Sequence, residues 1–258
     1  MDTVDERWID LDGMHNVRDL GGLQLDDGVM PRHVVLRGET VVHLTERGLE
    51  GLLDQGVERV LDLREPAEAA EDGFGPLSDL YRSGEIAHER VPLVGLPSIS
   101  EDPVGHVRHP HVVADSYARY LEQGGFHLSA ALSRFAWSQS AMFVHCAVGK
   151  DRTGVVCALL LKVAGASDDT VVADYVATAQ RLTPVITRLA ERPAYQHLVD
   201  PDWVAQQPSA EAMHLFLAEL GARGGASRWL LDHGMDPDTR DLLELRLRTS
   251  SRDVAAAS

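Results

Sequence analysis

The sequence contains little cysteine, few basic residues and no long hydrophobic segment. Two cysteines among 258 residues cannot form a disulfide framework, which favours a reducing compartment. Lysine and arginine number 24 against 40 acidic residues, and the net charge of −16 argues against nucleic acid or an anionic membrane as a main partner. No stretch approaches the roughly 18 apolar residues that span a bilayer, and the acidic N-terminal residues do not resemble a secretory signal. We therefore expect a cytoplasmic protein without stable membrane association.

The chain has the composition of a folded globular protein, with 44% hydrophobic and 25% charged residues. No repeat or linker divides it, so we expect one domain over residues 1–252 and a flexible tail over residues 253–258.

Hydrophobic patterns and capping residues predict alternating strands and helices. The predicted strands are residues 57–63, 86–93 and 141–145, and the predicted helices are residues 45–55, 112–123, 126–139 and 153–164, with further helices after Ser167 and Asp236. Residues 96–111 hold three prolines and three histidines and are predicted to be a loop. Since a helical block follows the early alternation, we expect an α/β layered domain with a helical cover.

Residues 144–154, VHCAVGKDRTG, join a predicted buried strand to a predicted buried helix. A glycine-containing turn of this kind directs backbone N–H groups and the positive end of a helix at one point, which makes an anion site. Cys146 lies where that field stabilises a thiolate, and Arg152 can offer paired donors to a tetrahedral anion. Thr153 can donate a proton to the sulfur, and His145 can orient the loop.

Other interpretations account for fewer of these residues. A nucleotide-binding loop of the G-x-x-x-x-G-K-[ST] type is excluded, because Asp151 replaces the hydroxyl residue. A thiol protease needs a separate histidine and an oxyanion hole but does not need Arg152. A buried structural cysteine is the commonest alternative, and we expect that role for Cys157, in the middle of an apolar helix.

The segment HCAVGKDRTG resembles the signature of cysteine-dependent tyrosine phosphatases, and its Lys150-Asp151 pair resembles the bacterial atypical branch of tyrosine and dual-specificity enzymes. Other segments similar to that branch are NVRDLGG at 16–22, LRGE at 36–39, VLDLR at 60–64, DY at 174–175 and the C-terminal GGASRWLLDHGMDPDTRDLLELRLR. The resemblance covers most of the chain. It implies a single catalytic domain with a central, mostly parallel sheet flanked by helices and a helical C-terminal block.

The resemblance further implies two-step hydrolysis of a phosphomonoester, without a metal or cofactor. Cys146 is expected to attack phosphorus and form a phosphocysteine, which water then hydrolyses. The loop amides and the Arg152 side chain are expected to hold the phosphate oxygens. The implied phosphate-binding residues are Ala147, Val148, Gly149, Lys150, Asp151 and Arg152.

A carboxylic acid must protonate the leaving oxygen, and three aspartates are candidates. The bacterial branch has an aspartate where this chain has Gly95. Asp151 is our first candidate, because it lies within the loop. Asp102 lies on the proline- and histidine-rich loop, which can fold over the site. Asp62 is the third, with a structural pairing to Arg64 as its alternative.

Four basic side chains near these segments have two interpretations each. Lys150 either contacts a further acidic group of the substrate or is a solvated surface lysine. Arg18, Arg37 and Arg64 either raise the positive potential around the site or hold the scaffold.

His106, His109 and His111 have no spacing typical of a metal site, so no metal is expected. The lid that some relatives insert before the signature is expected to be shortened here to residues 96–123. A thiolate under a short lid is exposed to oxidation. No disulfide between Cys146 and Cys157 is expected, because the helix separates them by roughly 16 Å.

Three functions are consistent with the sequence. The leading one is a protein-tyrosine or dual-specificity phosphatase, for which phosphoinositides are a further candidate substrate. The second is a phosphatase of a small soluble phosphomonoester such as a phosphorylated nucleoside, nucleotide or sugar, which the acidic net charge favours. The third is a phosphate-binding pseudophosphatase. The partner in each case is a phosphorylated molecule, and the sequence does not indicate an oligomeric state.

Overall fold

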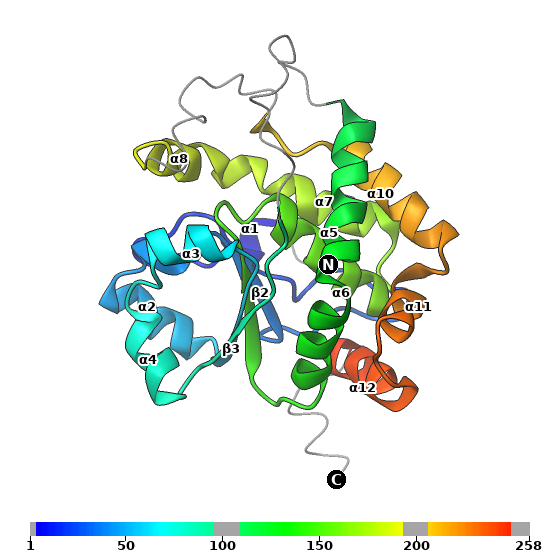
Figure 1. The fold of residues 1–258 in the computed structure, drawn as a ribbon, viewed down its shortest axis with the longest axis horizontal. Helices are drawn as coiled ribbons and strands as arrows, with labels where there is room; N and C mark the ends of the chain where they lie inside the picture. The colour runs from blue at the N-terminus through cyan, green and yellow to red at the C-terminus, as the bar shows by residue number, and fades with distance from the viewer. Residues whose placement is uncertain (1–3, 95–108, 193–205, 249–258) are drawn as a thin grey trace.

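The structure, a computed structural model, describes residues 4–94, 109–192 and 206–248. Its strands form one sheet in the order β1-β2-β5-β3-β4 (Figure 1). The strands are β1 Val17–Asp19, β2 Val35–Gly38, β3 Val57–Asp62, β4 Ala87–Arg90 and β5 Ala141–His145. β1 pairs with β2 in the antiparallel sense, and the other pairings are parallel. The expected mostly parallel sheet is confirmed.

Helices cover both faces of this sheet. On one side lie α2 Glu46–Asp54, α3 Pro66–Asp72 and α4 Leu77–Ser83. The other side carries α5 Pro110–Ala136, α6 Asp151–Val163, α7 Asp168–Ala177, α10 Ala210–Ala222, α11 Gly225–Asp232 and α12 Pro237–Arg248 (Figure 1). Helix α8, Ala179–Leu189, lies above α3 at the upper left of Figure 1, and its apolar residues cluster with Ala147, which follows β5. The short helix α1, Val4–Arg7, precedes β1. The C-terminal block is helical, as expected.

The buried residues of β5 alternate between two hydrophobic cores. Met142 and Val144 belong to the core shared with α5, α6 and α10, whereas Ala141 and Phe143 belong to the core shared with α2. Since successive side chains of a strand point to opposite faces, a wholly apolar strand fits a sheet buried on both sides.

The predicted helix and strand starts agree closely with the structure. Thr45 caps α2, where its hydroxyl oxygen accepts the Gly48 N–H at 3.1 Å. Ser167 caps α7 in the same way, accepting the Thr170 N–H at 3.1 Å. These side chains satisfy amides that a helix start leaves unpaired, and so mark the start in the sequence.

The predicted break within α5 is confirmed, but the predicted ends are wrong. The two helices predicted at 112–123 and 126–139 meet at a kink, where Gly125 has non-helical backbone angles, and the second ends at Ala136. The predicted loop extended to residue 111, but Pro110 and His111 belong to α5, because proline suits the first turn of a helix. A side chain at Gly124 would lie 2.6 Å from Leu93, so the glycine lets the helix approach the segment after β4.

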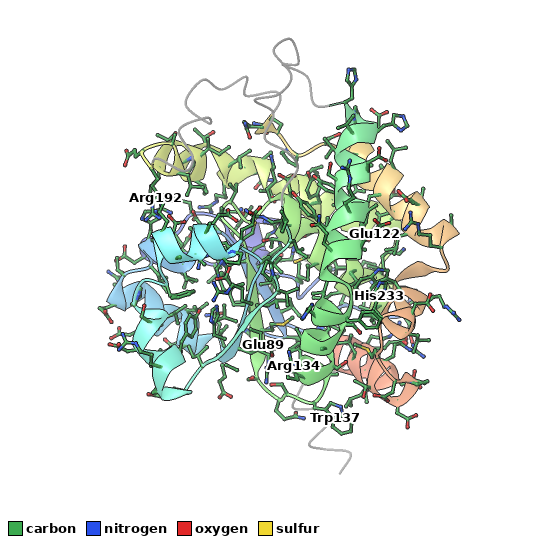
Figure 2. The ribbon with its side chains drawn as sticks, viewed as in Figure 1. Glu89, Glu122, Arg134, Trp137, Arg192 and His233 are labelled. Atoms are coloured by element: carbon green, nitrogen blue, oxygen red, sulfur yellow. The ribbon has the colours of Figure 1, made fainter. Side chains whose placement is uncertain are left out.

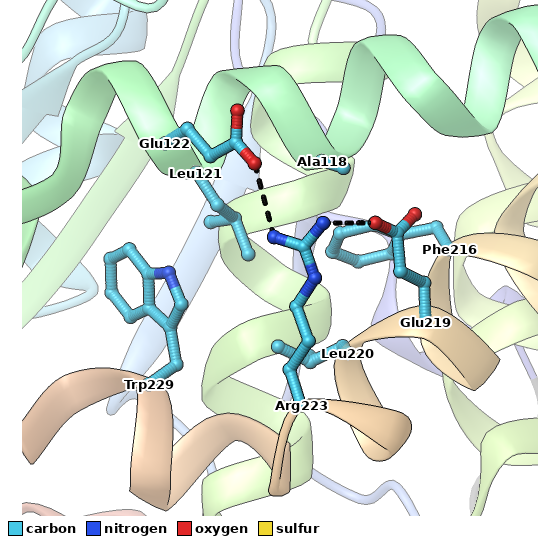
Figure 3. A pocket seen from close by; sticks show the side chains of 8 residues that line it. All are labelled: Ala118, Leu121, Glu122, Phe216, Glu219, Leu220, Arg223 and Trp229. Carbon is cyan, nitrogen blue, oxygen red and sulfur yellow. Dashed lines mark hydrogen bonds and ion pairs between the residues drawn. The ribbon is translucent and has the colours of Figure 1, made fainter. Parts of the chain in front are cut away.

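Ion pairs tie α5 to its neighbours. Arg134 of α5 binds Glu89 of β4 with an N–O distance of 2.5 Å, and the two side chains lie side by side in Figure 2. Arg223 bridges Glu122 of α5 and Glu219 of α10 over a small apolar pocket (Figure 3). Because these pairs are partly exposed to solvent, each is worth at most about 1 kcal/mol. Packing of apolar side chains therefore contributes most of the stabilisation between α5 and its neighbours.

No helix in the described part of the chain is long and apolar enough to cross a membrane. Residues 249–258, which include the expected tail, lie outside the described residues, and the single-domain organisation stays a prediction.

Candidate active site

A short segment that we call the cysteine loop, residues 146–150, follows β5 in the parallel part of the sheet. β2, β3 and β4 run parallel to β5 or to each other, so their carboxyl ends lie at the same edge. Helix α6 begins at Asp151, directly after the loop, and its N-terminus faces this edge. Ligands of open α/β sheets bind at such an edge.

Three successive carbonyl groups of the cysteine loop are bound from outside the loop. The bonds run from Thr40 N to Ala147 O at 3.1 Å, from Asn16 Nδ2 to Val148 O at 2.8 Å and from Arg37 Nη2 to Gly149 O at 2.9 Å. In a trans peptide the N–H group points opposite to the carbonyl. The N–H groups of Val148, Gly149 and Lys150 therefore point to the inner side of the loop.

Cys146 lies on that inner side. The Gly149 N–H donates to Cys146 Sγ at 3.3 Å, and the cysteine is buried. The positive end of α6 adds to the field of these amides. Together they favour negative charge on the sulfur and on an anion placed above it.

The conformation of the cysteine loop requires a glycine at position 149. Its φ angle is +75°, and a Cβ atom there would lie 2.4 Å from the Gly38 carbonyl oxygen of β2. A larger residue would both strain the backbone and push the loop from the sheet.

Arg152 is held by Glu68 of α3. The two side chains form a bidentate pair, with N–O distances of 2.5 and 2.8 Å. Burial alone would lower the pKa of Arg152, but the Glu68 carboxylate raises it well above its ordinary value. Glu68 also accepts the Glu65 N–H, which fixes it in the first turn of α3. The guanidinium therefore stays charged and oriented.

Asp174 of α7 is the buried centre of the scaffold behind the loop. It pairs with Arg7, Arg18 and Arg37 at N–O distances of 2.8, 3.0 and 2.7 Å. Burial would raise the pKa of Asp174, but the three arginines outweigh it and hold the pKa below its ordinary value. Arg37 binds the loop directly, and Arg18 binds Asn16 at 3.1 Å, which binds the loop in turn.

A second buried group lies under the start of the loop. Asp62, at the end of β3, binds Arg64 at 2.8 Å and is inaccessible to solvent. His145 Nε2 lies 3.9 Å from Asp62 Oδ1, and His145 Nδ1 lies 3.2 Å from the Cys146 carbonyl oxygen. Burial lowers the pKa of His145 to about 4, so this histidine is neutral near pH 7.

Lys150 and Thr153 are both buried beside the loop. Lys150 Nζ donates to the Gln206 carbonyl oxygen at 2.7 Å and lies 3.4 Å from Asp151 Oδ2. Thr153 Oγ1 forms no hydrogen bond with the residues that the structure describes.

Asp151 contacts two tyrosines of other helices. Its Oδ1 accepts a hydrogen bond from Tyr117 of α5 at 2.5 Å and a longer one from Tyr175 of α7 at 3.4 Å. The Asp151 side chain is 24% exposed, so it is more accessible to solvent than the neighbouring Lys150 side chain.

Comparison with known proteins identifies the family. The sequence profile described as "Tyrosine phosphatase family" matches residues 9–249. The chain belongs to this family. The expected resemblance to bacterial tyrosine and dual-specificity phosphatases is thus confirmed at the level of the family.

Curated relatives of this tyrosine phosphatase family member include three bacterial proteins. A tyrosine-protein phosphatase of Nostoc commune is 27% identical over 59% of this chain and 51% of its own length. A protein of Cupriavidus necator is 30% identical over 66% of this chain and 62% of its own. A triple specificity protein phosphatase of Mycobacterium tuberculosis is 26% identical over 61% of this chain and 65% of its own length. The chain thus spans between half and two thirds of the length of these relatives.

A solved structure of kinase associated phosphatase aligns with 80% of this chain, and the alignment covers 86% of the phosphatase chain at 16% sequence identity. Its TM-score of 0.29 is too low for a comparison of the sites.

The predicted site residues of this phosphatase family member lie around one loop. Cys146 is inside it, and Arg152, Asp151 and Thr153 are in the first turn of α6. Lys150 is buried, so its interpretation as a solvated surface lysine is wrong. Arg18, Arg37 and Arg64 each bind a buried aspartate, which favours the scaffold interpretation. Their catalytic roles stay predictions.

Some predicted residues are remote or lie outside the described residues. Gly95, Asp102 and His106 belong to the segment that the structure does not describe, as do residues 96–108 of the expected lid, whereas residues 110–123 form the first part of α5. His109 and His111 are exposed at the start of α5. Within residues 4–94, 109–192 and 206–248, no group of three or more histidine, cysteine or acidic side chains could hold a metal ion.

The sequence analysis assigned no role at the site to Glu68, Tyr117 or Tyr175. Glu68 has a local signal, since Glu65, Pro66 and Glu68 form a helix-start pattern. Tyr175 lies in the DY segment that resembles the phosphatase family, but that segment does not indicate a contact with Asp151. Tyr117 has no signal, because it approaches Asp151 from a helix that is distant in sequence.

Replacing Asp174, the central carboxylate of the scaffold, should make the protein less stable. We predict that Asp174→Asn lowers the free energy of unfolding by about 3–5 kcal/mol, because three buried arginines lose their shared counterion. Urea denaturation followed by circular dichroism measures this change. Asp168→Asn, on the exposed first turn of the same helix, is the control and should cost less than about 1 kcal/mol. Equal effects of the two substitutions would contradict the assigned role.

Acid should destabilise the protein through His145. Its pKa is about 4 when folded and near 6.5 when unfolded, so the unfolded chain binds more protons between these values. Stability should therefore fall by about 3 kcal/mol as the pH drops from 6.5 to 4. Denaturation at several pH values should show a smaller slope for His145→Asn than for the wild type. Parallel slopes would show that this histidine does not contribute.

Proposed function

We propose that this chain is a cysteine-dependent phosphatase that hydrolyses phosphomonoesters through a phosphocysteine. The proposal depends above all on the cysteine loop, whose three outward carbonyls leave inward N–H groups above Cys146. Membership of the tyrosine phosphatase family supports the same chemistry. The loop amides of Ala147, Val148, Gly149, Lys150, Asp151 and Arg152 are the proposed phosphate-binding groups.

In the first step, Cys146 Sγ attacks phosphorus. The S–P bond forms while the bond from phosphorus to the leaving oxygen breaks, and the leaving oxygen takes the proton of Asp151. The Arg152 guanidinium and the loop amides bind the equatorial oxygens, whose charge is greatest in the transition state. Because Glu68 already orients Arg152, little reorganisation is needed at that moment.

In the second step, water attacks the phosphocysteine. The Asp151 carboxylate accepts one proton from the water, the S–P bond breaks, and phosphate leaves with Cys146 as a thiolate. The Thr153 hydroxyl donates a hydrogen bond to the departing thiolate and keeps its proton. This hydroxyl is buried and forms no hydrogen bond with another described residue, which supports such a role.

The leading substrates are phosphotyrosine and phosphoserine or phosphothreonine side chains. Phosphoinositides are a further candidate. The relative from Mycobacterium tuberculosis is called a triple specificity protein phosphatase, which supports testing more than one class of substrate.

A small soluble phosphomonoester is the second candidate substrate. The net charge of −16 favours it, because an acidic protein repels acidic peptides and anionic lipid surfaces. A comparison of kcat/KM for phosphotyrosine peptide, phosphoserine peptide, inositol phosphates and nucleotides separates the two candidates.

Replacing the nucleophile should abolish turnover but preserve anion binding. We expect Cys146→Ser to show no hydrolysis of p-nitrophenyl phosphate, since its hydroxyl is a much weaker nucleophile than a thiolate, and to bind tungstate in calorimetry. Cys157→Ala is the matched control, because this second cysteine is buried in α6, and it should retain turnover. Hydrolysis above background by Cys146→Ser would refute the proposed function.

The general acid can be identified from pH–rate profiles. We expect Asp151→Asn to lose the basic limb of the kcat/KM profile and 10²–10⁴-fold of its activity, roughly the usual contribution of a general acid. Asp102→Asn should keep that limb. The reverse result would assign the proton transfer to Asp102.

A further inference from the structure

The tyrosine hydroxyls that contact Asp151 belong to one hydrogen-bonded chain. Tyr117 OH lies 2.5 Å from Asp151 Oδ1 and 2.6 Å from Tyr175 OH. Both tyrosines are 1% exposed. The chain therefore runs from the buried interior, between α5 and α7, to the carboxyl group that borders the cysteine loop.

The direction of the bonds follows from the number of protons. Each hydroxyl carries one hydrogen. When Tyr117 donates to an ionised Asp151, the 2.6 Å bond between the tyrosines needs Tyr175 as its donor, so Tyr175 then has no hydrogen for the longer 3.4 Å contact with Asp151. Tyr175 thereby polarises Tyr117 and strengthens the bond to the carboxylate.

Gly154 of α6 makes room for this arrangement. A Cβ atom at that position would lie 2.8 Å from the ring of Tyr175. A glycine inside a helix costs about 1 kcal/mol relative to alanine, so its presence indicates a packing requirement. The absent side chain lets the Tyr175 ring lie against α6 one turn after Asp151.

The surroundings of Tyr117 keep its hydroxyl protonated. Burial raises the pKa of Tyr117 well above its ordinary value, and the neighbouring Asp151 raises it further. The Phe216 ring of α10 packs edge-on against Tyr117 and adds no charge. Tyr117 can therefore donate to Asp151 near neutral pH.

Other ionisable groups face the site from several elements. Lys150 Nζ lies 3.4 Å from Asp151 Oδ2, whereas the tyrosines contact Oδ1. Further ionisable groups of the described residues around the loop include Cys146, Arg152 of α6, Glu68 of α3, Tyr120 of α5, Arg37 of β2, and His145 and Asp62 under its start. Lys150 stabilises the carboxylate as the tyrosines do, so the two contributions must be separated by mutation.

We propose that Tyr117 and Tyr175 are positioning residues that fix the Asp151 carboxyl group and set its ionisation for proton transfer. This inference rests on the proposed function, because it gives the tyrosines a part in that reaction. Hydrogen bonds to a carboxylate are stronger than those to the neutral acid. The chain therefore stabilises Asp151 as it loses its proton to the leaving oxygen.

A direct titration tests the proposal without turnover. The probe is the ¹³C resonance of the Asp151 carboxyl group in the full-length Cys146→Ser chain, assigned by its loss in Asp151→Asn. Removal of the Tyr117 hydroxyl in Tyr117→Phe should raise the pKa of Asp151 by about one unit, a tenfold change in the protonation equilibrium. Tyr175→Phe, which acts chiefly through Tyr117, should give a smaller rise.

Tyr81→Phe is the matched control. Tyr81 lies in α4 and packs against the core on the other face of the sheet from Tyr117, and its buried hydroxyl forms no hydrogen bond with the described residues. Its removal should leave the titration unchanged. An unshifted Asp151 in both Tyr117→Phe and Tyr175→Phe would overturn the proposal.

Kinetics then connect the titration to the reaction. In the active chain, Tyr117→Phe should move the basic limb of the pH profile upward by the same amount and lower kcat about tenfold, with KM little changed. A loss that is equal at every pH would indicate a merely structural role and would overturn the proposal. Turnover by Cys146→Ser would instead refute the proposed function. The titration of the Asp151 carboxyl group would still show whether the tyrosines affect its ionisation.

Discussion

The site depends on the outward orientation of three carbonyl groups in the cysteine loop. A peptide that directs its oxygen outward must direct its hydrogen inward, so the contacts of Thr40, Asn16 and Arg37 create the anion-binding side of the loop. Two of these contacts lead back to Asp174 through buried arginines. One carboxylate in α7 thus fixes the backbone that would hold phosphate.

The cations near the anion site each lie beside an acidic partner, although the protein as a whole is acidic. The charged groups at the loop have partners: Arg152 binds Glu68, Lys150 lies beside Asp151, and Arg37 shares Asp174 with two other arginines. A buried charge without a partner would cost several kcal/mol. The partners therefore keep these groups ionised and in place, and the overall charge of −16 says little about the field at Cys146.

Much of this could be predicted from the sequence, because the decisive signals are local. The apolar strand before Cys146, the glycine of the loop and the caps at Thr45 and Ser167 act on their own neighbours. Long-range contacts could not be predicted: nothing near Asp151 indicates that Tyr117 reaches it from α5. The helix break was predicted from the sequence as well: the two predicted helices meet at Gly125, whose backbone angles are not helical, because glycine adopts angles that other residues avoid.

Detection of the phosphocysteine tests the central claim most directly. The full-length protein, mixed with p-nitrophenyl phosphate and quenched in acid within the first turnover, can be digested and analysed by mass spectrometry. The account predicts a phosphate adduct on the peptide that contains Cys146. Turnover without any adduct, or with the phosphate on a different residue, would contradict it.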